Sequence, residues 1–562
     1  MTRQQFQQLT SQAPVLLDGE IRVGCNEREC PEKWVLDHFD TITGALCSFK
    51  DAGSVIVRAP TAGANRYRLE AFGLASQTRE INRELMRRCR AALESISVLG
   101  VCSTTGMNIE PFGELGFEEA VKSFSEQGES LLEGGADGFI CHMTDIQEAR
   151  AAVLALRELG DLPVMVYMGF GQQWLTANGT DPLSALVTLQ SIGADAVGFG
   201  GTGEYSAAEV IAKIKPFAAI PLFAFPPAGA MSPEQYANSA QTLIHVGVNL
   251  IGGSSDASPE HIASIRSRLH RSPCCTPVVK SISALSSARR TVMLGRSYPF
   301  AVVGERINPT GKKQLQASLR EGSLDMVKRF AVEQEQRKAS VLDVNMGLSG
   351  IDEMAMMLRS VNLLSCLSPL PLCIDTTKPE VVEAALRRYP GRALVNSISG
   401  EKERIERTLP ATAKYGAMFI ILPLTDAGIP ASVKERIGVV DIVLTAASSF
   451  GYTVNDVAVD GLVMTISSDQ GAALATLDLI EYCSQTLRTN TIVGLSNVSF
   501  GMPERQWING AFLGMAMGRG LTMAISNPSS DGIMATVQAY NSLRSHDFGM
   551  LMQSGNFTGI GQ

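Results

Sequence analysis

Sixteen short apolar runs, separated by helix-length segments, are the feature that most constrains the fold of this chain. They form two sets of eight. The first set is VLLDG (15–19), SVIVRAP (54–60), SVLGVCSTTG (97–106), DGFICHM (137–143), PVMVYMGFG (163–171), ADAVGFGG (194–201), IPLFAFPP (220–227) and VNLIGGSS (248–255). The second set is FAVVGERIN (300–308), ASVLDVNMG (339–347), PLCIDTT (371–377), ALVNSISG (393–400), AMFIILPLT (417–425), DVAVDGLV (456–463), TIVGLSNVSF (491–500) and GLTMAISNP (520–528). Such runs alternating with amphipathic helices indicate parallel strands buried on both faces.

Eight strand–helix units in about 250 residues is the size of one TIM barrel, so the sequence predicts an α/β protein with two tandem TIM (β/α)8 barrels. A chain of 562 residues is also too long to fold around a single hydrophobic core. We place the first barrel at 1–270, a Ser- and Pro-rich linker at 271–299, the second barrel at 300–545 and a C-terminal tail at 546–562. In EGGADGFI, SIGADAVGF and HVGVNLIGG, the glycine before the strand is predicted to be the left-handed cap of the preceding helix.

Charge and hydropathy limit the partners. The net charge is −8 and no long basic run occurs, which argues against nucleic acid. No apolar stretch approaches the roughly 18–20 residues that cross a bilayer, and the start, MTRQQFQQLTSQAP, lacks a signal-peptide core. The 11 scattered cysteines fit a reducing compartment better than a disulfide framework. We therefore expect a cytoplasmic protein without a membrane partner.

Polar side chains follow nearly every apolar run of the second set. These are Glu305, Arg306, Asn308, Asp343, Asn345, Asp375, Asn396, Ser397, Asp460, Asn497 and Asn527. Any one of them can be explained as the N-cap of the next helix. Together they favour a site for a flat, nitrogen-rich ring, because a 2-amino-4-oxo-pyrimidine edge presents adjacent N–H donors that match a carboxylate. The first set ends mostly in small residues, apart from Asp18, and offers no acid–base pair or metal site.

The second half, roughly 300–545, resembles the pterin-binding barrel of cobalamin-dependent methionine synthase and the methyltetrahydrofolate:corrinoid protein methyltransferases. The matching motifs are VVGERINPTGKK (302–313), LDVNMG (342–347), IDTT (374–377), VNSISGEKER (395–404) and GLSNVSFGMP (494–503). The resemblance implies that Asp375, Asn396 and Asp460 bind the pterin ring and that Asn497 hydrogen-bonds near N5. It makes Asp343, Asn345 and Asn308 supporting positions.

The first half resembles the homocysteine-binding barrel of the same synthase, through LLDG (16–19), NGTDP (178–182) and GVNLIGGSSDASPEHI (247–262). In that family three cysteines hold a zinc ion. The corresponding positions here are Gly201, Ser254 and Ser255. Glycine and serine do not replace thiolates around zinc, so no zinc is expected. The spacing of Cys25 with Cys30, and of Cys141 with His142, matches no common metal motif, and the adjacent Cys274 and Cys275 lie in the predicted linker.

The resemblance implies methyl transfer between N5 of tetrahydrofolate and the cobalt of a corrinoid. Because no Asp-x-His-x-x-Gly motif of a cobalamin module occurs in this sequence, we expect the cobalamin on a separate corrinoid protein. A homodimer is compatible with the resemblance, since related stand-alone methyltransferases are dimers.

Three alternatives remain open. The first is methionine synthase activity through a variant thiol site. The second is a non-catalytic module that binds pterin or a corrinoid protein. The third, dihydropteroate synthase, would need basic residues on the last strands, and GLSNVSFG and AISNPSSD provide none.

Overall fold

Two compact units, residues 1–279 and 280–562, make up the chain in the computed structural model. The structure describes residues 1–21, 23–202, 206–269, 277, 279, 281–467 and 471–544. The predicted tail, 546–562, and the pair Cys274 and Cys275 lie outside this part of the chain. Within it, no helix combines the length and apolar character that a membrane span requires.

Eight parallel strands form a barrel in the first unit, in the spatial order β1-β8-β7-β6-β5-β4-β3-β2. A parallel bridge between Leu17 and Ile56 joins the chain after β1 to β2 and closes the ring. The strands are β1 (Val15–Leu16), β2 (Ile56–Arg58), β3 (Ser97–Ser103), β4 (Gly138–Met143), β5 (Val164–Phe170), β6 (Ala196–Gly201), β7 (Leu222–Ala224) and β8 (Leu250–Ile251). Each lies within one of the predicted apolar runs.

The second unit repeats this arrangement in the order β17-β16-β15-β14-β13-β12-β11-β18. Here a bridge between Gly494 and Ile525 closes the ring. Its strands are β11 (Ala301–Ile307), β12 (Val341–Asn345), β13 (Leu372–Asp375), β14 (Leu394–Ser399), β15 (Met418–Leu422), β16 (Val457–Asp460), β17 (Asn490–Ile492) and β18 (Met523–Ser526). The prediction of two tandem (β/α)8 barrels is confirmed.

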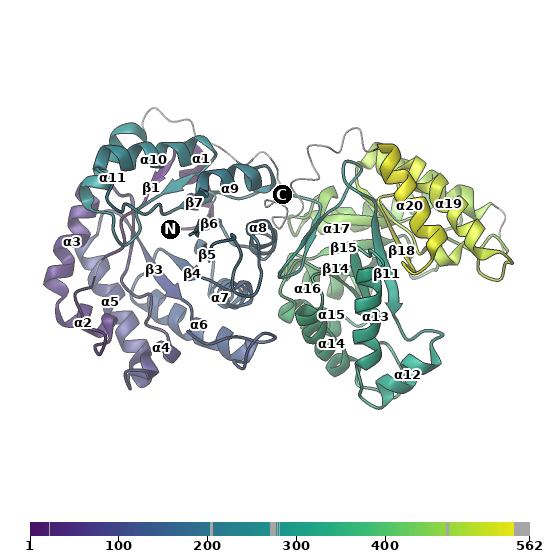
Figure 1. Cartoon of the computed structure of the whole chain (residues 1–562), viewed down its shortest axis with the longest axis horizontal. Coiled ribbons are helices and arrows are strands. Elements are labelled where there is room, and N and C mark those ends of the chain that lie inside the picture. Colours follow the sequence, from purple (N-terminus) through teal and green to yellow (C-terminus); the bar gives the residue numbers. More distant parts are fainter. Residues whose placement is uncertain are drawn as a thin grey trace. The chain divides into compact units, whose positions relative to one another are not determined.

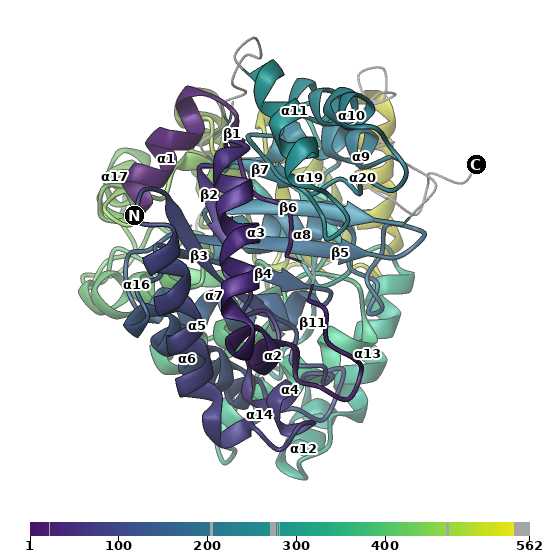
Figure 2. The same ribbon diagram turned by 90° about the vertical axis from the view of Figure 1, so that its left-hand side faces the viewer.

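Helices surround the strands of each unit. Figure 1 shows α13 to α17, α19 and α20 around the strands of the second unit, and Figure 2 shows α3, α5 and α6 outside those of the first. The helices of the first unit are α1 (Arg3–Gln12), α2 (Pro31–Asp37), α3 (Phe39–Asp51), α4 (Arg66–Glu70), α5 (Thr78–Ala92), α6 (Phe117–Glu133), α7 (Ile146–Glu158), α8 (Pro182–Ser191), α9 (Ala207–Ile214), α10 (Pro233–His245) and α11 (Pro259–Leu269). Those of the second are α12 (Lys313–Arg320), α13 (Asp325–Gln336), α14 (Glu353–Leu367), α15 (Pro379–Arg388), α16 (Leu409–Lys414), α17 (Val433–Ser448), α18 (Ala472–Tyr482), α19 (Arg505–Arg519) and α20 (Asp531–Arg544).

The glycines that precede three strands of the first unit adopt the predicted left-handed conformation. Gly135, Gly193 and Gly247 have φ values of 94°, 96° and 107°. A residue with a Cβ atom would be strained in this region of φ. These glycines end α6, α8 and α10 and let the chain turn directly into the next strand.

An antiparallel hairpin, β9 (Ala284–Ser286) with β10 (Thr291–Met293), lies within the segment predicted as a linker. Its Leu285 and Leu294 join the buried cluster formed by the inward side chains of the second barrel. Arg392, just before β14, donates to the carbonyl oxygens of Ile282 and Ala284 at 2.7 and 3.2 Å. Packing and hydrogen bonds thus make the hairpin part of the second unit.

Candidate functional site

Three neighbouring strands of the second barrel bring predicted site residues to one level at their carboxyl ends. Asn345 on β12 is the register partner of Asp375 on β13, and Asp375 is the partner of Asn396 on β14. Register partners on parallel strands point to the same face of a sheet. Two residues below Asp375, Cys373 belongs to the cluster that fills the barrel, so this face is the inner one. We call Asn345, Asp375 and Asn396 the polar layer.

The carboxylate of Asp375 is held by amides from two other strand ends. Asn345 donates from Nδ2 to Oδ2 of Asp375 at 2.9 Å, and Asn308 donates to the same oxygen at 3.5 Å. No hydrogen bond within the described residues involves Oδ1 of Asp375. This oxygen is therefore free to accept from a ligand in the barrel mouth.

Asp343 lies directly beneath the polar layer. It is 2% exposed, and Asn396 donates to its Oδ1 at 3.4 Å. Burial, and then the nearby charge of Asp375, raise the pKa of Asp343 well above its usual range. The protonated form of Asp343, which burial favours, can donate a hydrogen bond as well as accept one.

Two further carboxyl groups of the site have pKa values near neutrality. Burial raises the pKa of Asp375 to about 6, opposed by the hydrogen bond from Asn345. Burial also raises the pKa of Asp460 to about 6, opposed by the backbone N–H of Leu462. Removal from water costs free energy because it disfavours the charged carboxylate. A ligand that supplies N–H donors would offset part of this desolvation cost.

The N-cap alternative does not describe these residues. The helices that follow the relevant strands have other N-caps, including Asp352 before α14 and Lys378 before α15. Several tip residues instead accept a hydrogen bond from the backbone two residues ahead. These pairs are Asn308 with Thr310, Asn345 with Gly347, Asp460 with Leu462 and Asn527 with Ser529. Such Asx turns use one side-chain oxygen of each of these residues.

Asn497 lies in the one-turn 3₁₀ helix Leu495–Asn497 that follows β17, and its side chain is exposed. Within the described part of the chain its amide group makes no hydrogen bond. A Cβ atom at Gly494 would lie 3.1 Å from Nδ2 of Asn497, so this glycine gives the amide room. Asn497 is thus a free donor and acceptor at a strand end of the same barrel, apart from the polar layer.

Two features of the second barrel were missed from the sequence. Ser496, next to Asn497, donates its hydroxyl to the carboxylate of Glu305 at 3.2 and 3.3 Å, which joins the end of β17 to β11. Lys312 donates to the carbonyl oxygens of Glu305 and Asn308 at 3.4 and 3.1 Å. Lys312 lies in the motif VVGERINPTGKK and Ser496 in the motif GLSNVSFGMP, so both motifs contained a usable signal.

The first barrel places the expected zinc positions in surroundings that do not suit the metal. A Cβ atom at Gly201 would lie 3.3 Å from the ring of Trp174, which fills the neighbouring space. Ser254 donates its hydroxyl to Asp256, and Ser255 is exposed. No group of three or more His, Cys, Asp or Glu side chains in the described chain could hold a metal ion. With neither thiolate nor imidazole among them, Gly201, Ser254 and Ser255 do not fit zinc.

Asp18, the acid among the strand ends of the first set, is already paired. Nε of Arg58 donates to Oδ1 at 2.9 Å and the Arg58 backbone N–H donates to Oδ2 at 3.0 Å. The guanidinium also donates to the carbonyl oxygens of Asp18 and Gly253 at 2.9 and 2.7 Å. This fully buried pair ties the ends of three strands together and leaves no free carboxylate for a substrate ammonium group.

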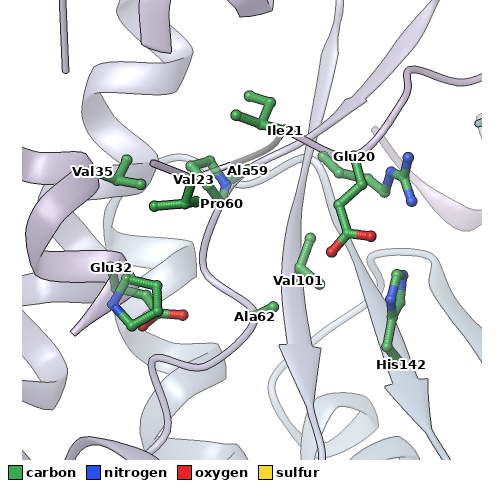
Figure 3. Close-up of a pocket in the computed structure, with 12 residues that line it drawn as sticks. Glu20, Ile21, Val23, Glu32, Val35, Ala59, Pro60, Ala62, Val101 and His142 are labelled. Atoms are coloured by element: carbon green, nitrogen blue, oxygen red, sulfur yellow. The ribbon is translucent and has the colours of Figure 1, made fainter. Parts of the chain in front are cut away.

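A pocket of about 160 Å³ lies beside Arg58. In Figure 3 the carboxylate of Glu20 points toward the side of the pocket where His142 lies, and apolar side chains such as Val23 and Val101 line the rest. Burial and the charge of Arg58 lower the pKa of His142 to about 3, so its ring is neutral. The volume is below the roughly 300–1,000 Å³ of small-molecule sites, so this pocket cannot enclose a folate.

Comparison with known proteins relates each unit to a different family. Residues 5–269 match the family described as Homocysteine S-methyltransferase, and residues 304–527 match the family described as Pterin binding enzyme. Methionine synthase of Mycobacterium leprae is 24% identical over 523 residues, which cover 85% of this chain and 43% of that relative. The chain thus spans less than half the length of the curated relatives it matches.

Two solved structures each match just under half of this chain. A metallated homocysteine methyltransferase from Escherichia coli is 20% identical with a TM-score of 0.41, over 46% of this chain and 98% of its own. A dihydropteroate synthase from Xanthomonas albilineans is 17% identical with a TM-score of 0.37, over 47% of this chain and 99% of its own.

Proposed function

We propose that the second barrel transfers a methyl group between N5 of tetrahydrofolate and the cobalt of a corrinoid on a separate protein. The chain is a methionine-synthase-like pair of barrels, a homocysteine S-methyltransferase domain followed by a pterin-binding domain. The observation that carries the proposal is the polar layer above Asp343, in which Asn345, Asp375 and Asn396 stand in register.

The polar layer suits the pterin edge. The ionised carboxylate of Asp375 accepts from the ring amide and the 2-amino group, while Asn396 both donates and accepts. Asp460, on the other side of the barrel mouth, offers a second acceptor. Each hydrogen bond to a charged group contributes roughly 1.5–3 kcal/mol, which is enough for a few such contacts to fix the ring.

Asn497 has a different role in the proposal. The folate amine is a poor leaving group, so N5 must be protonated or strongly hydrogen-bonded as the methyl group departs. The free amide of Asn497 supplies such a contact to the developing charge. The barrel otherwise acts by position, since it holds the methyl group in line with the cobalt that a corrinoid partner presents. The same contacts serve both directions of transfer.

In this proposal the first barrel does not activate homocysteine. Trp174 packs where a ligand at position 201 would extend, and Ser254 is bonded to Asp256. This argues against the alternative of methionine synthase activity. A cytoplasmic location belongs to the proposal.

The test uses the full chain with methyltetrahydrofolate and chemically reduced cob(I)alamin as a stand-in for the corrinoid protein. We expect the cob(I)alamin absorbance to fall as methylcobalamin and tetrahydrofolate form in equal amounts. Tight folate binding without methyl transfer, either to free cob(I)alamin or to a panel of corrinoid proteins, would instead support a non-catalytic pterin-binding module.

A further inference from the structure

A cavity of about 1070 Å³ opens at the carboxyl ends of β5 to β8 in the first barrel. Its wall includes Phe170 at the end of β5, Gly200 on β6, Phe225 after β7 and Ser254 after β8. The volume is at the upper end of the range for small-molecule sites. The mouth of a TIM barrel is also where such folds place their ligands.

The lining of this cavity is aromatic and uncharged. No Asp, Glu, Lys, Arg or His occurs among the described residues that line it. Four of these are aromatic: Tyr167, Phe170, Phe199 and Phe225. The rings of Tyr167 and Phe225 lie 5.3 Å apart and those of Phe170 and Phe199 lie 6.2 Å apart, the spacing at which aromatic rings attract. A planar ring inserted here would meet a wall made of similar rings.

Two charged groups near the cavity, Asp256 and Arg58, are paired elsewhere. Asp256 accepts from the backbone N–H groups of Ala228 and Gly229 at 3.0 and 2.6 Å, and from Ser254. Arg58, whose guanidinium stacks 4.2 Å from the Phe225 ring centroid, is paired with Asp18. An ionised ligand would lose hydration and gain no partner from Asp256 or Arg58.

The Tyr167 hydroxyl in the wall is available to a ligand. A Cβ atom at Gly200 would lie 1.7 Å from the hydroxyl oxygen of Tyr167, so only glycine leaves that hydroxyl its place. Within the described residues the Tyr167 hydroxyl has no hydrogen-bond partner. It can therefore hold a polar substituent of a bound molecule.

From this wall we infer that the first barrel binds an uncharged aromatic small molecule with a hydrogen-bonding group, rather than a zwitterionic amino acid. The site requires no metal and no second protein. It also does not depend on folate chemistry in the second barrel, so binding is measured without folate or corrinoid.

The matched probes 2-naphthol and 2-naphthoate share a ring system and differ in charge at neutral pH. Titration of the full chain by calorimetry should show one 2-naphthol bound per chain. We expect 2-naphthoate to bind at least tenfold more weakly, and L-homocysteine to give no binding heat. Equal affinity for the two naphthalenes, or failure to bind 2-naphthol up to its solubility limit, would overturn the inference.

Two substitutions test whether 2-naphthol binds in the cavity. Ala208→Trp, on a half-buried lining residue of α9, should abolish 2-naphthol binding, and Ala177→Trp, on an exposed lining residue after β5, should weaken it at least fivefold. Ala91→Trp, on the exposed face of α5, is the matched control and should bind normally. If both cavity variants fold and bind 2-naphthol like the control, the ligand sits elsewhere and the inference is wrong.

The tyrosine hydroxyl has its own test. Tyr167→Phe should weaken 2-naphthol about two- to tenfold, the usual effect of one neutral hydrogen bond, and leave naphthalene binding unchanged. An equal loss of affinity for 2-naphthol and naphthalene would show that Tyr167 acts through packing alone. It would then remove the hydrogen-bonding group from the inferred ligand.

Discussion

Asn345 donates a hydrogen bond of 2.9 Å to Asp375, its register partner on the neighbouring strand of the second barrel. Asn308 donates to the same carboxylate oxygen at 3.5 Å. The amides thus hold one oxygen in place while the other faces the barrel mouth. This arrangement orients a carboxylate before any ligand arrives, which is what tight recognition of a rigid ring requires.

Asp375→Asn should weaken methyltetrahydrofolate binding by about ten- to a hundredfold, because it removes the charge from a hydrogen bond worth roughly 1.5–3 kcal/mol. Isothermal titration calorimetry measures the change. Asp441→Asn, on the exposed surface of α17, is the matched control and should bind like the unaltered protein. An unchanged affinity in Asp375→Asn would remove this residue from the pterin site.

Folate affinity should fall as the pH drops through about 6, the value to which burial raises the pKa of Asp375. The ionised carboxylate is the form that accepts two N–H donors, and below this pH it is protonated. Dissociation constants measured between pH 5 and 8 at constant ionic strength should rise by up to about tenfold per unit below pH 6. In Asp375→Asn this slope should become shallower, with the remainder due to Asp460, whose pKa is also about 6, and an unchanged slope would show that Asp375 does not contribute to it.

Asp460→Asn should stabilise the protein at pH 7.5 while it weakens folate binding. Its folded pKa of about 6 exceeds the unfolded value, so the ionised form is disfavoured in the folded state. The stability that protonation provides is present below about pH 4 and lost as the pH rises through 6. The gain should be about 1–3 kcal/mol at pH 7.5 and vanish near pH 4. Scanning calorimetry of the full chain measures the unfolding transition that Asp460→Asn affects. A loss of stability at pH 7.5 would contradict the raised pKa of Asp460.

Asn497→Ala should lower the rate of methyl transfer by about a hundredfold, the usual effect of removing one donor from a developing charge. Folate affinity should change less than threefold, because the amide is needed mainly as N5 gains its proton. Single-turnover kinetics with cob(I)alamin give the rate and calorimetry the affinity. Parallel losses in the two would mean that Asn497 only helps to bind folate.

The purified protein should contain no stoichiometric zinc and form no methionine from homocysteine and methylcobalamin. Gly201, Ser254 and Ser255 provide no ligand of the kind that zinc prefers. Plasma mass spectrometry of protein purified from zinc-supplemented medium checks the first point and an amino-acid assay the second. Methionine formation that a chelator abolishes would establish a zinc-dependent thiol site.

The sequence was sufficient for the strands but not for the contacts between them. All sixteen apolar runs became strands, because a strand buried on both faces must be apolar along its length. The hairpin of β9 and β10 was not predicted. Each of its strands has only three residues, too few to show a period, and the hairpin is held by Leu285, Leu294 and Arg392 across long stretches of chain.

The sequence by itself determined the two barrels, the acids and amides at the ends of the second set of strands, and the absence of cysteine at positions 201, 254 and 255. These follow from local patterns and residue identities. Only the tertiary structure decided that Asn345, Asp375 and Asn396 share one level, that Ser496 contacts Glu305, and that the Trp174 ring lies beside Gly201. Strand register and side-chain packing join residues far apart in the chain, and the free energy of those contacts exists only once the barrel has closed.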